Sequence, residues 1–241
     1  MIGCDCPVCT STNPMNSRTR PSVLFHLPGG NLLVDTGPEL RIQLVRERIR
    51  DVNAVLYTHY HVDHLFGLDD VRVFPWKHKQ PMPVYCADDV EEVIRSAFSY
   101  AFHPPPDNAP SFVLPQLVFR RIDSQPFEVL GETVTPVPLI HGRFNVLGFR
   151  IGDLAYCTDV NKIPDASWPL LVGLDTLILD CLRPGESHPS HFGLDDALQV
   201  VERVKPKRTY FTHMSHKWDC DHLPPLPPGV APAFDGLRIE F

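Results

Sequence analysis

Apolar residues along this chain of 241 residues occur mainly in short runs or in alternation with polar residues, which is the pattern of β-strands. Strands are predicted at 22–27, 31–35, 54–57, 83–87, 117–122, 127–138, 148–157, 176–182, 208–212 and 236–241. Segments with helical periodicity lie between them, at 38–49, 88–98 and 194–204. This order predicts an α/β protein. A four-layer αβ/βα sandwich of two facing sheets with outer helices fits it, as a single domain over residues 1–241.

The charge balance limits the classes of partner. The formal net charge is −7, and the densest basic run, 205–208, is too short for the Lys and Arg cluster that a nucleic-acid backbone requires. A small anionic substrate fits, because bound metal cations can dominate the local field. The sequence contains no stretch of about 18 or more apolar residues, so it predicts no membrane span. The first residues lack the charged start and apolar core of a secretion signal, so we expect a cytoplasmic location.

A dense set of metal-binding side chains directly follows the predicted strand 54–57. His59, His61, Asp63 and His64 lie within six residues, and imidazole with carboxylate suits zinc, manganese or iron. Residues two apart on an extended segment point to the same side, so His59 and His61 can bind one ion. Asp63 and His64, after a turn, can face a second ion. The alternative is a polar surface loop rich in histidine, which rarely produces such a run.

The spacing His-x-His-x-Asp-His resembles the signature of the metallo-β-lactamase superfamily. The resemblance implies that fold, with two divalent ions, Zn or Mn, in the active site. It also implies three later ligands, each after a predicted strand: His141, Asp159 as a bridging carboxylate, and His213. The first ion would take His59, His61, His141 and Asp159. The second would take Asp63, His64, Asp159 and His213. Each later residue alone is more often an ordinary loop residue, so the set in this order carries the assignment.

Asp35 ends the predicted strand 31–35 in the run Asp35-Thr36-Gly37, which resembles another element of the superfamily. We expect its carboxylate to accept a hydrogen bond from the free ring N–H of a ligating imidazole and so orient that ring. The alternative is a carboxylate that only stabilises a turn.

Three cysteines, Cys4, Cys6 and Cys9, crowd into six residues at the start of the chain. In a chain without a secretion signal this crowding indicates metal binding rather than disulfides. Three thiolates need a fourth ligand to complete a tetrahedral zinc site. His216, three residues after His213, is the first candidate, and Cys220 and His222 are alternatives. A redox-active or incidental cysteine cluster is the competing interpretation.

Residues 3–9, followed by 18–22, resemble one branch of the superfamily, that of the phosphoribosyl 1,2-cyclic phosphate phosphodiesterase of the carbon–phosphorus lyase pathway. The resemblance places Cys4, Cys6, Cys9 and His216 on the ligands of a structural zinc. It implies that His191 faces the substrate phosphate as a general acid, a role that suits an imidazole. For His191 alone, the competing interpretation is a surface residue at the start of a helix.

Relatives are often dimers, so a homodimer is among the expected states. Members of the branch begin with a strand before the cysteines, so either the chain starts further upstream or its first sheet lacks that strand.

The leading hypothesis is therefore a phosphodiesterase for a small phosphate ester, with cyclic ribose phosphates among the candidate substrates. Metal-activated hydroxide would attack, and Asp63 would help to orient it. The alternatives are a carboxylic ester, thioester or lactone hydrolase, and a non-catalytic metal-binding protein that carries a cofactor. The proline-rich segment 102–112 is expected either to form a preordered wall of the substrate pocket or to be a simple connector.

Overall fold

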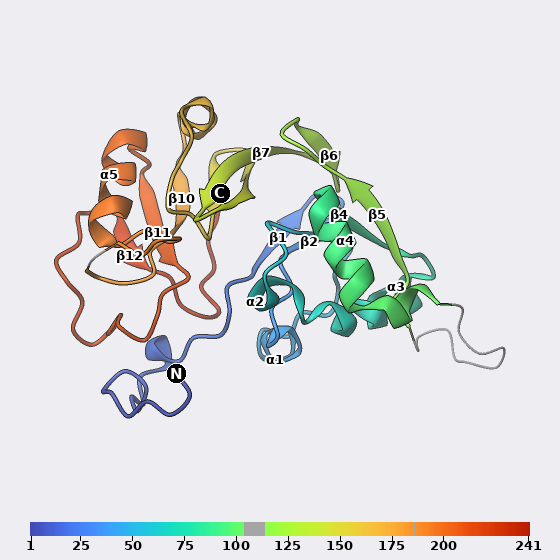
Figure 1. Ribbon diagram of the computed structural model, residues 1–241, viewed down its shortest axis with the longest axis horizontal. Coiled ribbons are helices and arrows are strands. Elements are labelled where there is room, and N and C mark those ends of the chain that lie inside the picture. The colour runs from blue at the N-terminus through green and yellow to red at the C-terminus, as the bar shows by residue number, and fades with distance from the viewer. Residues whose placement is uncertain (104–113, 186) are drawn as a thin grey trace. The chain divides into compact units, whose positions relative to one another are not determined.

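The computed structural model describes residues 1–103, 114–185 and 187–241 (Figure 1). The chain folds into two compact units. Residues 20–133 form one, called here the middle unit; residues 1–19 with 134–241 form the other, called the terminal unit. Most of the expected wall segment 102–112 lies outside the described residues, so its role stays a prediction. None of the helices in the described part of the chain combines the length and apolarity needed to traverse a lipid bilayer.

The middle unit contains a five-stranded sheet in the order β1-β2-β3-β4-β5. Its strands are β1 Val23–Leu27, β2 Gly30–Val34, β3 Ala54–Leu56, β4 Met82–Cys86 and β5 Leu117–Arg121. Its helices are α1 Leu40–Arg46, α2 Val62–Leu65, α3 Val73–His78 and α4 Asp88–Ala97, with 3-10 turns η2 Leu68–Arg72 and η3 Ser99–Phe102. Only β1 and β2 pair antiparallel; the other pairs are parallel. The carboxyl ends of β2, β3 and β4 therefore lie at one edge of the sheet.

The core of the middle unit forms where the apolar face of α4 packs on the sheet. Val90 and Ile94 are four residues apart on this helix and bury their side chains in one cluster with Val55 and Val84. β3 is buried at every position, as expected of a parallel strand covered on both faces. The histidine-rich run, residues 59–64, begins three residues after the end of this strand.

The strands of the terminal unit belong to a second sheet, with order β12-β11-β10-β9-β8-β7-β6, of which β6 and the first two residues of β7 fall within 20–133. Its strands are β6 Phe127–Val129, β7 Glu132–His141, β8 Phe144–Ile151, β9 Leu154–Cys157, β10 Thr176–Asp180, β11 Arg208–Thr212 and β12 Val230–Pro232. The helix α5 Leu194–Val204 and the 3-10 turns η1 Pro14–Asn16 and η4 Asp165–Leu171 complete the unit. α5 buries Leu194, Ala197 and Val200 in a core that also holds Phe211 and Trp218.

Several boundaries differ from the sequence prediction. The single strand predicted at 127–138 is two strands, because Leu130 and Gly131 both take positive φ angles, of 51° and 83°, and turn the chain. Likewise, 148–157 divides between β8 and β9 at Gly152. The predicted C-terminal strand at 236–241 was wrong: the edge of the second sheet is β12, Val230–Pro232.

Candidate metal centre and active site

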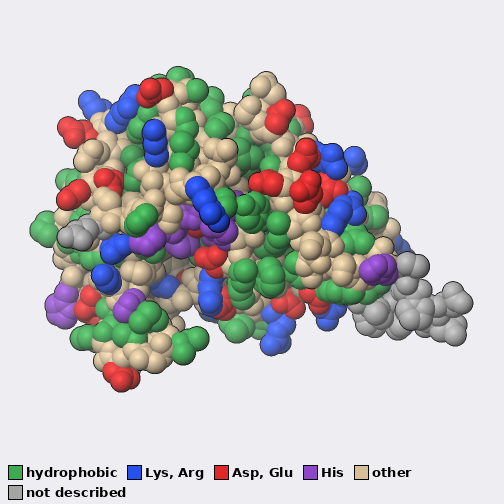
Figure 2. Space-filling view, viewed as in Figure 1, with side chains coloured by type: hydrophobic (Ala, Val, Ile, Leu, Met, Phe, Trp, Pro, Cys, Tyr) green, Lys and Arg blue, Asp and Glu red, His purple; other side chains and the backbone are tan. Residues whose placement is uncertain are grey.

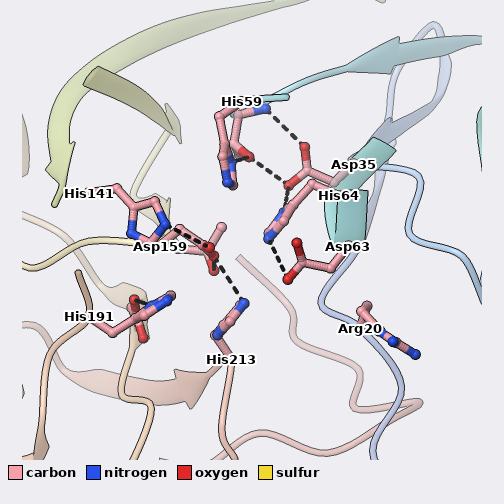
Figure 3. Close-up of polar contacts among 12 residues, drawn as sticks. Arg20, Asp35, His59, Asp63, His64, His141, Asp159, His191 and His213 are labelled. Atoms are coloured by element: carbon pink, nitrogen blue, oxygen red, sulfur yellow. Dashed lines mark hydrogen bonds and ion pairs between the residues drawn. The ribbon is translucent and has the colours of Figure 1, made fainter. Parts of the chain in front are cut away.

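The histidine-rich run of the middle unit is anchored by a buried carboxylate. Asp35 directly follows β2, is fully buried, and accepts hydrogen bonds from the backbone N–H of Thr58 at 2.9 Å and the Thr58 hydroxyl at 2.8 Å. It also lies 2.8 Å from Nδ1 of His64 (Figure 3). Since a carboxylate accepts, Nδ1 of His64 carries the proton and Nε2 is the ring atom left for a ligand. Burial raises the pKa of Asp35, and the charge and hydrogen bonds of His64 and those of Thr58 oppose this rise.

The Asp35-Thr36-Gly37 run packs closely against α2, which carries Asp63 and His64. The backbone N–H of Thr36 donates to the His64 carbonyl over 2.7 Å. A Cβ atom on Gly37 would stand 2.8 Å from the carbonyl oxygen of Asp63, and one on Gly67 would stand 2.1 Å from that of Gly37. Both positions therefore require glycine for steric reasons, which explains why Gly37 accompanies Asp35 in the sequence.

The terminal unit places its three predicted ligands after strands. His141 ends β7, Asp159 follows β9 and His213 follows β11. The two oxygens of Asp159 face different imidazoles: Oδ2 lies 3.8 Å from Nε2 of His141, and Oδ1 lies 3.4 Å from Nε2 of His213 (Figure 3). Nδ1 of His141 donates to the carbonyl of Ser190 over 2.6 Å, so Nε2 of His141 is the ring atom left for a ligand.

These contacts fit a pair of metal ions. Ligand atoms about 2.0–2.2 Å from a tetrahedral ion lie about 3.4 Å from each other, close to the Asp159 distances. A carboxylate that directs one oxygen to each of two imidazoles is suited to bridging two ions. The middle unit carries His59, His61, Asp63 and His64, and the terminal unit carries His141, Asp159 and His213.

Three of the site residues have strained backbones. Asp35, Asp159 and His213 have φ angles of 63°, 54° and 55°, in the left-handed region that residues with a Cβ rarely adopt. Such strain costs about 1–3 kcal/mol per residue and is concentrated at functional sites. Asp35 and His213 directly follow a strand, and Asp159 follows one after a single residue, so each strained residue turns its side chain near a strand end.

The cysteine cluster is fully formed within the terminal unit. Nδ1 of His216 lies 3.5, 3.4 and 3.6 Å from the sulfurs of Cys4, Cys6 and Cys9. Zn–S bonds of about 2.3 Å and Zn–N bonds of about 2.0 Å in a tetrahedron place sulfur and nitrogen about 3.5 Å apart, so the four residues fit one zinc ion. The backbone N–H of Cys9, followed by the His216 ring, lowers the pKa of the Cys6 thiol to about 6, which favours the thiolate that zinc binds.

The alternatives for the fourth ligand point elsewhere. The Cys220 thiol lies 3.5 Å from the Met15 carbonyl oxygen, and Nδ1 of His222 lies 2.9 Å from Asp219. His216 is thus the candidate that the structure brings to the three thiols.

Comparison with known proteins places the chain in a family. A model of the beta-lactamase superfamily domain matches residues 30–214. The chain belongs to the metallo-β-lactamase superfamily. A solved structure of a new diphosphatase from the PhnP family is 41% identical, covers 100% of this chain and 91% of that chain, and superposes with a TM-score of 0.91. The predicted metallo-β-lactamase fold and its PhnP branch are thereby confirmed.

More distant relatives extend this comparison. The short form of human tRNase Z shares the fold, with a TM-score of 0.70 at 20% identity over 94% of each chain. Among curated proteins, the octanoyltransferase of Porphyromonas gingivalis is 34% identical over 240 residues, 98% of this chain and 48% of that protein. The ribonuclease Z of Methanopyrus kandleri is 40% identical over 57 residues, 23% of this chain and 20% of that protein. The chain thus spans about half of the first curated relative.

The metallo-β-lactamase site of the terminal unit contains one residue that sequence reasoning missed. Asp180, the last residue of β10, is fully buried, and its Oδ2 lies 2.6 Å from Nδ1 of His191. The same oxygen accepts the backbone N–H of Val160 over 2.8 Å. Because β9, β10 and β11 are parallel, Asp180 ends at the same sheet edge as Asp159 and His213. The sequence signal that could have identified Asp180 is a carboxylate at the end of an otherwise apolar strand, which is buried at every position.

His191 lies among the predicted ligands of the same unit. Its ring centre is 4.6 Å from that of His141 and 4.7 Å from that of His213. Since Asp180 accepts from Nδ1, Nε2 of His191 is the ring atom that can face a substrate. Burial raises the pKa of Asp180, and the hydrogen bond and charge of His191 oppose that rise.

Proposed function

We propose that this protein is a metal-dependent hydrolase that cleaves a phosphodiester bond in a small phosphate ester, cyclic ribose phosphates included. The observation that carries the proposal is the 41% identity, along the whole chain, to the diphosphatase from the PhnP family. The superfamily itself supports the coarser assignment of a metal-dependent hydrolase.

The proposed metal ligands are the two sets given above. In the proposal, one divalent ion is held by His59, His61, His141 and Asp159, and the other by Asp63, His64, Asp159 and His213. Imidazoles and carboxylates suit zinc or manganese. Two such ions polarise a phosphoryl group and make a water nucleophilic near neutral pH. A structural zinc on Cys4, Cys6, Cys9 and His216 is part of the same proposal.

The chain's own residues would then position the water and supply the proton. His191, held by Asp180, presents Nε2 and is proposed to protonate the alkoxide leaving group. Asp63, whose side chain is 38% exposed at the start of α2, is proposed to orient the attacking water in addition to its ligand role.

The decisive experiment is hydrolysis of bis(p-nitrophenyl) phosphate by protein reconstituted separately with zinc and manganese, beside an Asp159→Ala variant. We expect turnover that requires metal and is lost in the variant. If the protein is shown to hold its full complement of metal but hydrolyses the diester with neither zinc nor manganese, the phosphodiesterase proposal is wrong.

A second candidate is hydrolysis of a carboxylic ester or thioester by the same residues. The match to the octanoyltransferase favours it, although this chain spans only 48% of that protein. Hydrolysis of p-nitrophenyl octanoate in the same metal-reconstituted samples tests it. Turnover of the octanoate without turnover of the diester would replace the leading proposal.

A further inference from the structure

The sheet of the middle unit ends at β5, which pairs with β4 on one side. Within the residues that the structure describes, no strand pairs with the other side of β5. Two backbone bonds beside the ladder show how the strand is oriented. The N–H of Met82 donates to the Gln116 carbonyl over 2.7 Å. At the other end of the strand, the N–H of Ile122 donates to the Cys86 carbonyl over 3.0 Å.

The unpaired side of β5 therefore presents the backbone of three residues. Gln116 and Ile122 bond to β4, and the backbone groups of successive residues in a strand point to alternate sides. The N–H and C=O groups of Leu117, Phe119 and Arg121 consequently point away from β4. A row of backbone groups of this kind is where an extended segment of another chain can add as a further strand.

An open cavity of about 610 Å³ runs along this edge. It is lined by all five residues of β5, 117–121, together with Glu91 and Arg95 of α4. Successive side chains of a strand point to opposite faces of the sheet, so a cavity that touches all five residues lies along the strand edge rather than above one face. The cavity thus lies where an added strand would lie.

Two arginines of the cavity are held in place by one buried carboxylate. Glu91 is 5% exposed and accepts from Nε of Arg95 over 2.7 Å and from Nε of Arg121 over 2.9 Å. The Arg95 guanidinium also stacks on the rings of Phe102 and Phe119, with its carbon 4.8 and 4.7 Å from the ring centres. Both bonds to Glu91 use Nε, so the terminal N–H groups of each guanidinium are the donors left for a ligand.

The cavity is positively charged although the chain is acidic. Its lining contains three arginines and one glutamate, whereas the whole chain has a formal net charge of −7. Asp88, beside the lining, pairs with Arg121 at 3.1 Å and leaves the local balance positive. Arg120 is exposed, and no carboxylate in the described part of the chain pairs with it. In Figure 2, Lys and Arg side chains lie among Asp and Glu side chains where Figure 1 places α4 and the end of β5.

This charge distinguishes between the candidate occupants. A second copy of the chain that added its own β5 would bring arginines next to arginines, and like charges on paired strands are destabilising. A segment that carries carboxylates pairs with the arginines instead, and such complementarity gives an interface its specificity. A nucleic acid would neutralise the arginines, but its backbone cannot continue a β-sheet.

We propose that the edge of β5 binds an acidic, extended segment of a partner protein, which adds to the five-stranded sheet as a further strand. The outward backbone groups of β5 would hold the segment, and the three arginines would select its carboxylates. This surface contains none of the proposed metal ligands, so the inference goes beyond the proposed hydrolase function. The competing interpretation is that the arginines only protect the edge from aggregation, as charges on edge strands often do.

The binding test uses the full-length chain and a fluorescein-labelled decapeptide of alternating glutamate and valine. By fluorescence anisotropy we expect saturable binding of this peptide and no binding of the matching peptide of alternating lysine and valine. Arg120→Ala should weaken binding about tenfold, because a hydrogen bond to a charged group is lost. Arg120 is the residue to replace, since Arg95 and Arg121 also hold Glu91.

Arg41→Ala is the matched control. Arg41 is an exposed arginine of α1 in the same unit and lies outside the cavity lining. This variant should bind the decapeptide as tightly as the wild type does. Both variants should melt at the wild-type temperature, because each replaces an exposed side chain.

Amide hydrogen exchange, measured residue by residue with NMR, tests the strand addition itself. In the free chain, the N–H groups of Leu117, Phe119 and Arg121 should exchange quickly. Those of Val118 and Arg120 face β4 and should exchange slowly. Saturating decapeptide should slow exchange about tenfold or more at the three edge positions and leave the other two nearly unchanged.

The remaining outcomes overturn the proposal. Binding without this alternating protection would show that the arginines attract the peptide without strand pairing. Edge amides that are already protected in the free chain would show that the edge has another occupant. Absence of binding, or equal binding by Arg120→Ala, removes the site, and binding of a decauridylate in place of the peptide assigns the arginines to a nucleic acid. None of these readouts requires turnover, so failure of the proposed hydrolase function leaves the test intact.

Discussion

Oδ2 of Asp180 lies 2.6 Å from Nδ1 of His191, and both side chains are buried within the terminal unit. The backbone N–H of Val160 donates to the same oxygen, so the carboxylate is itself fixed. An imidazole held in this way has one tautomer and one orientation, which is what a proton donor needs.

Replacement of Asp180 by Asn should therefore reduce catalysis in a manner that depends on the leaving group. We expect kcat on a dialkyl phosphate diester to fall roughly 10²-fold, because general acid catalysis contributes about that much. The rate on bis(p-nitrophenyl) phosphate, whose leaving group needs no proton, should change much less. Steady-state kinetics on both esters gives the ratio, with Asp153→Asn, in the turn between β8 and β9, as the control. Equal losses on the two esters would assign Asp180 a purely structural role.

Cys6→Ser should remove one zinc per chain and leave the other metals bound. The variant should also melt at a lower temperature, because binding of a structural zinc contributes directly to folding. Metal content by plasma emission spectroscopy and melting by calorimetry check both expectations. Cys220→Ser is the matched control, since the Cys220 thiol lies outside the cluster, near the Met15 carbonyl. Unchanged zinc content in Cys6→Ser would show that the cluster does not bind metal.

Glu91 on α4 should make stability depend on pH. Burial alone would raise its pKa, but hydrogen bonds from Arg121 at 2.9 Å and Arg95 at 2.7 Å outweigh this and lower it. A lowered carboxylate pKa stabilises the fold above the unfolded value of about 4.3 and ceases to do so as the pH falls through the folded value. Glu91→Gln should thus cost about 1 kcal/mol at pH 7 and progressively less below pH 4. Urea unfolding from pH 7 to 3, with exposed Glu92→Gln as control, measures this; a difference independent of pH contradicts it.

The strained backbone at His213 predicts an unusual order of stabilities. With φ at 55°, glycine should be favoured over alanine, so metal-free His213→Gly should be more stable than His213→Ala by about 1 kcal/mol. At His191, which lies outside the left-handed region, the order should reverse. Chemical denaturation of the four metal-free variants gives both differences. Greater stability of the alanine variant at position 213 would show that the conformation there is unstrained.

Much of the fold is readable from the sequence because burial and periodicity coincide. The helix 194–204 and the strand 208–212 have the predicted bounds, since each carries a clean apolar pattern. The turn at Leu130 and Gly131 escaped prediction because apolar and polar residues alternate through 127–138 almost without a break, so the segment has the pattern of one long strand. The role of Asp180 escaped prediction because it depends on contact with His191, eleven residues later. It also depends on the parallel pairing of β9, β10 and β11, which places the end of β10 at the same sheet edge as Asp159 and His213.

The cysteine cluster joins residues that are synthesised far apart in time. Its histidine follows its three thiols by 207 to 212 positions. During translation the sulfurs therefore leave the ribosome long before their fourth partner does. Throughout that interval the three thiols lack the imidazole that, in the finished fold, helps to lower the pKa of the Cys6 thiol. Closure of the cluster then ties residues 1–19 to residues 134–241, the two segments that make up the terminal unit.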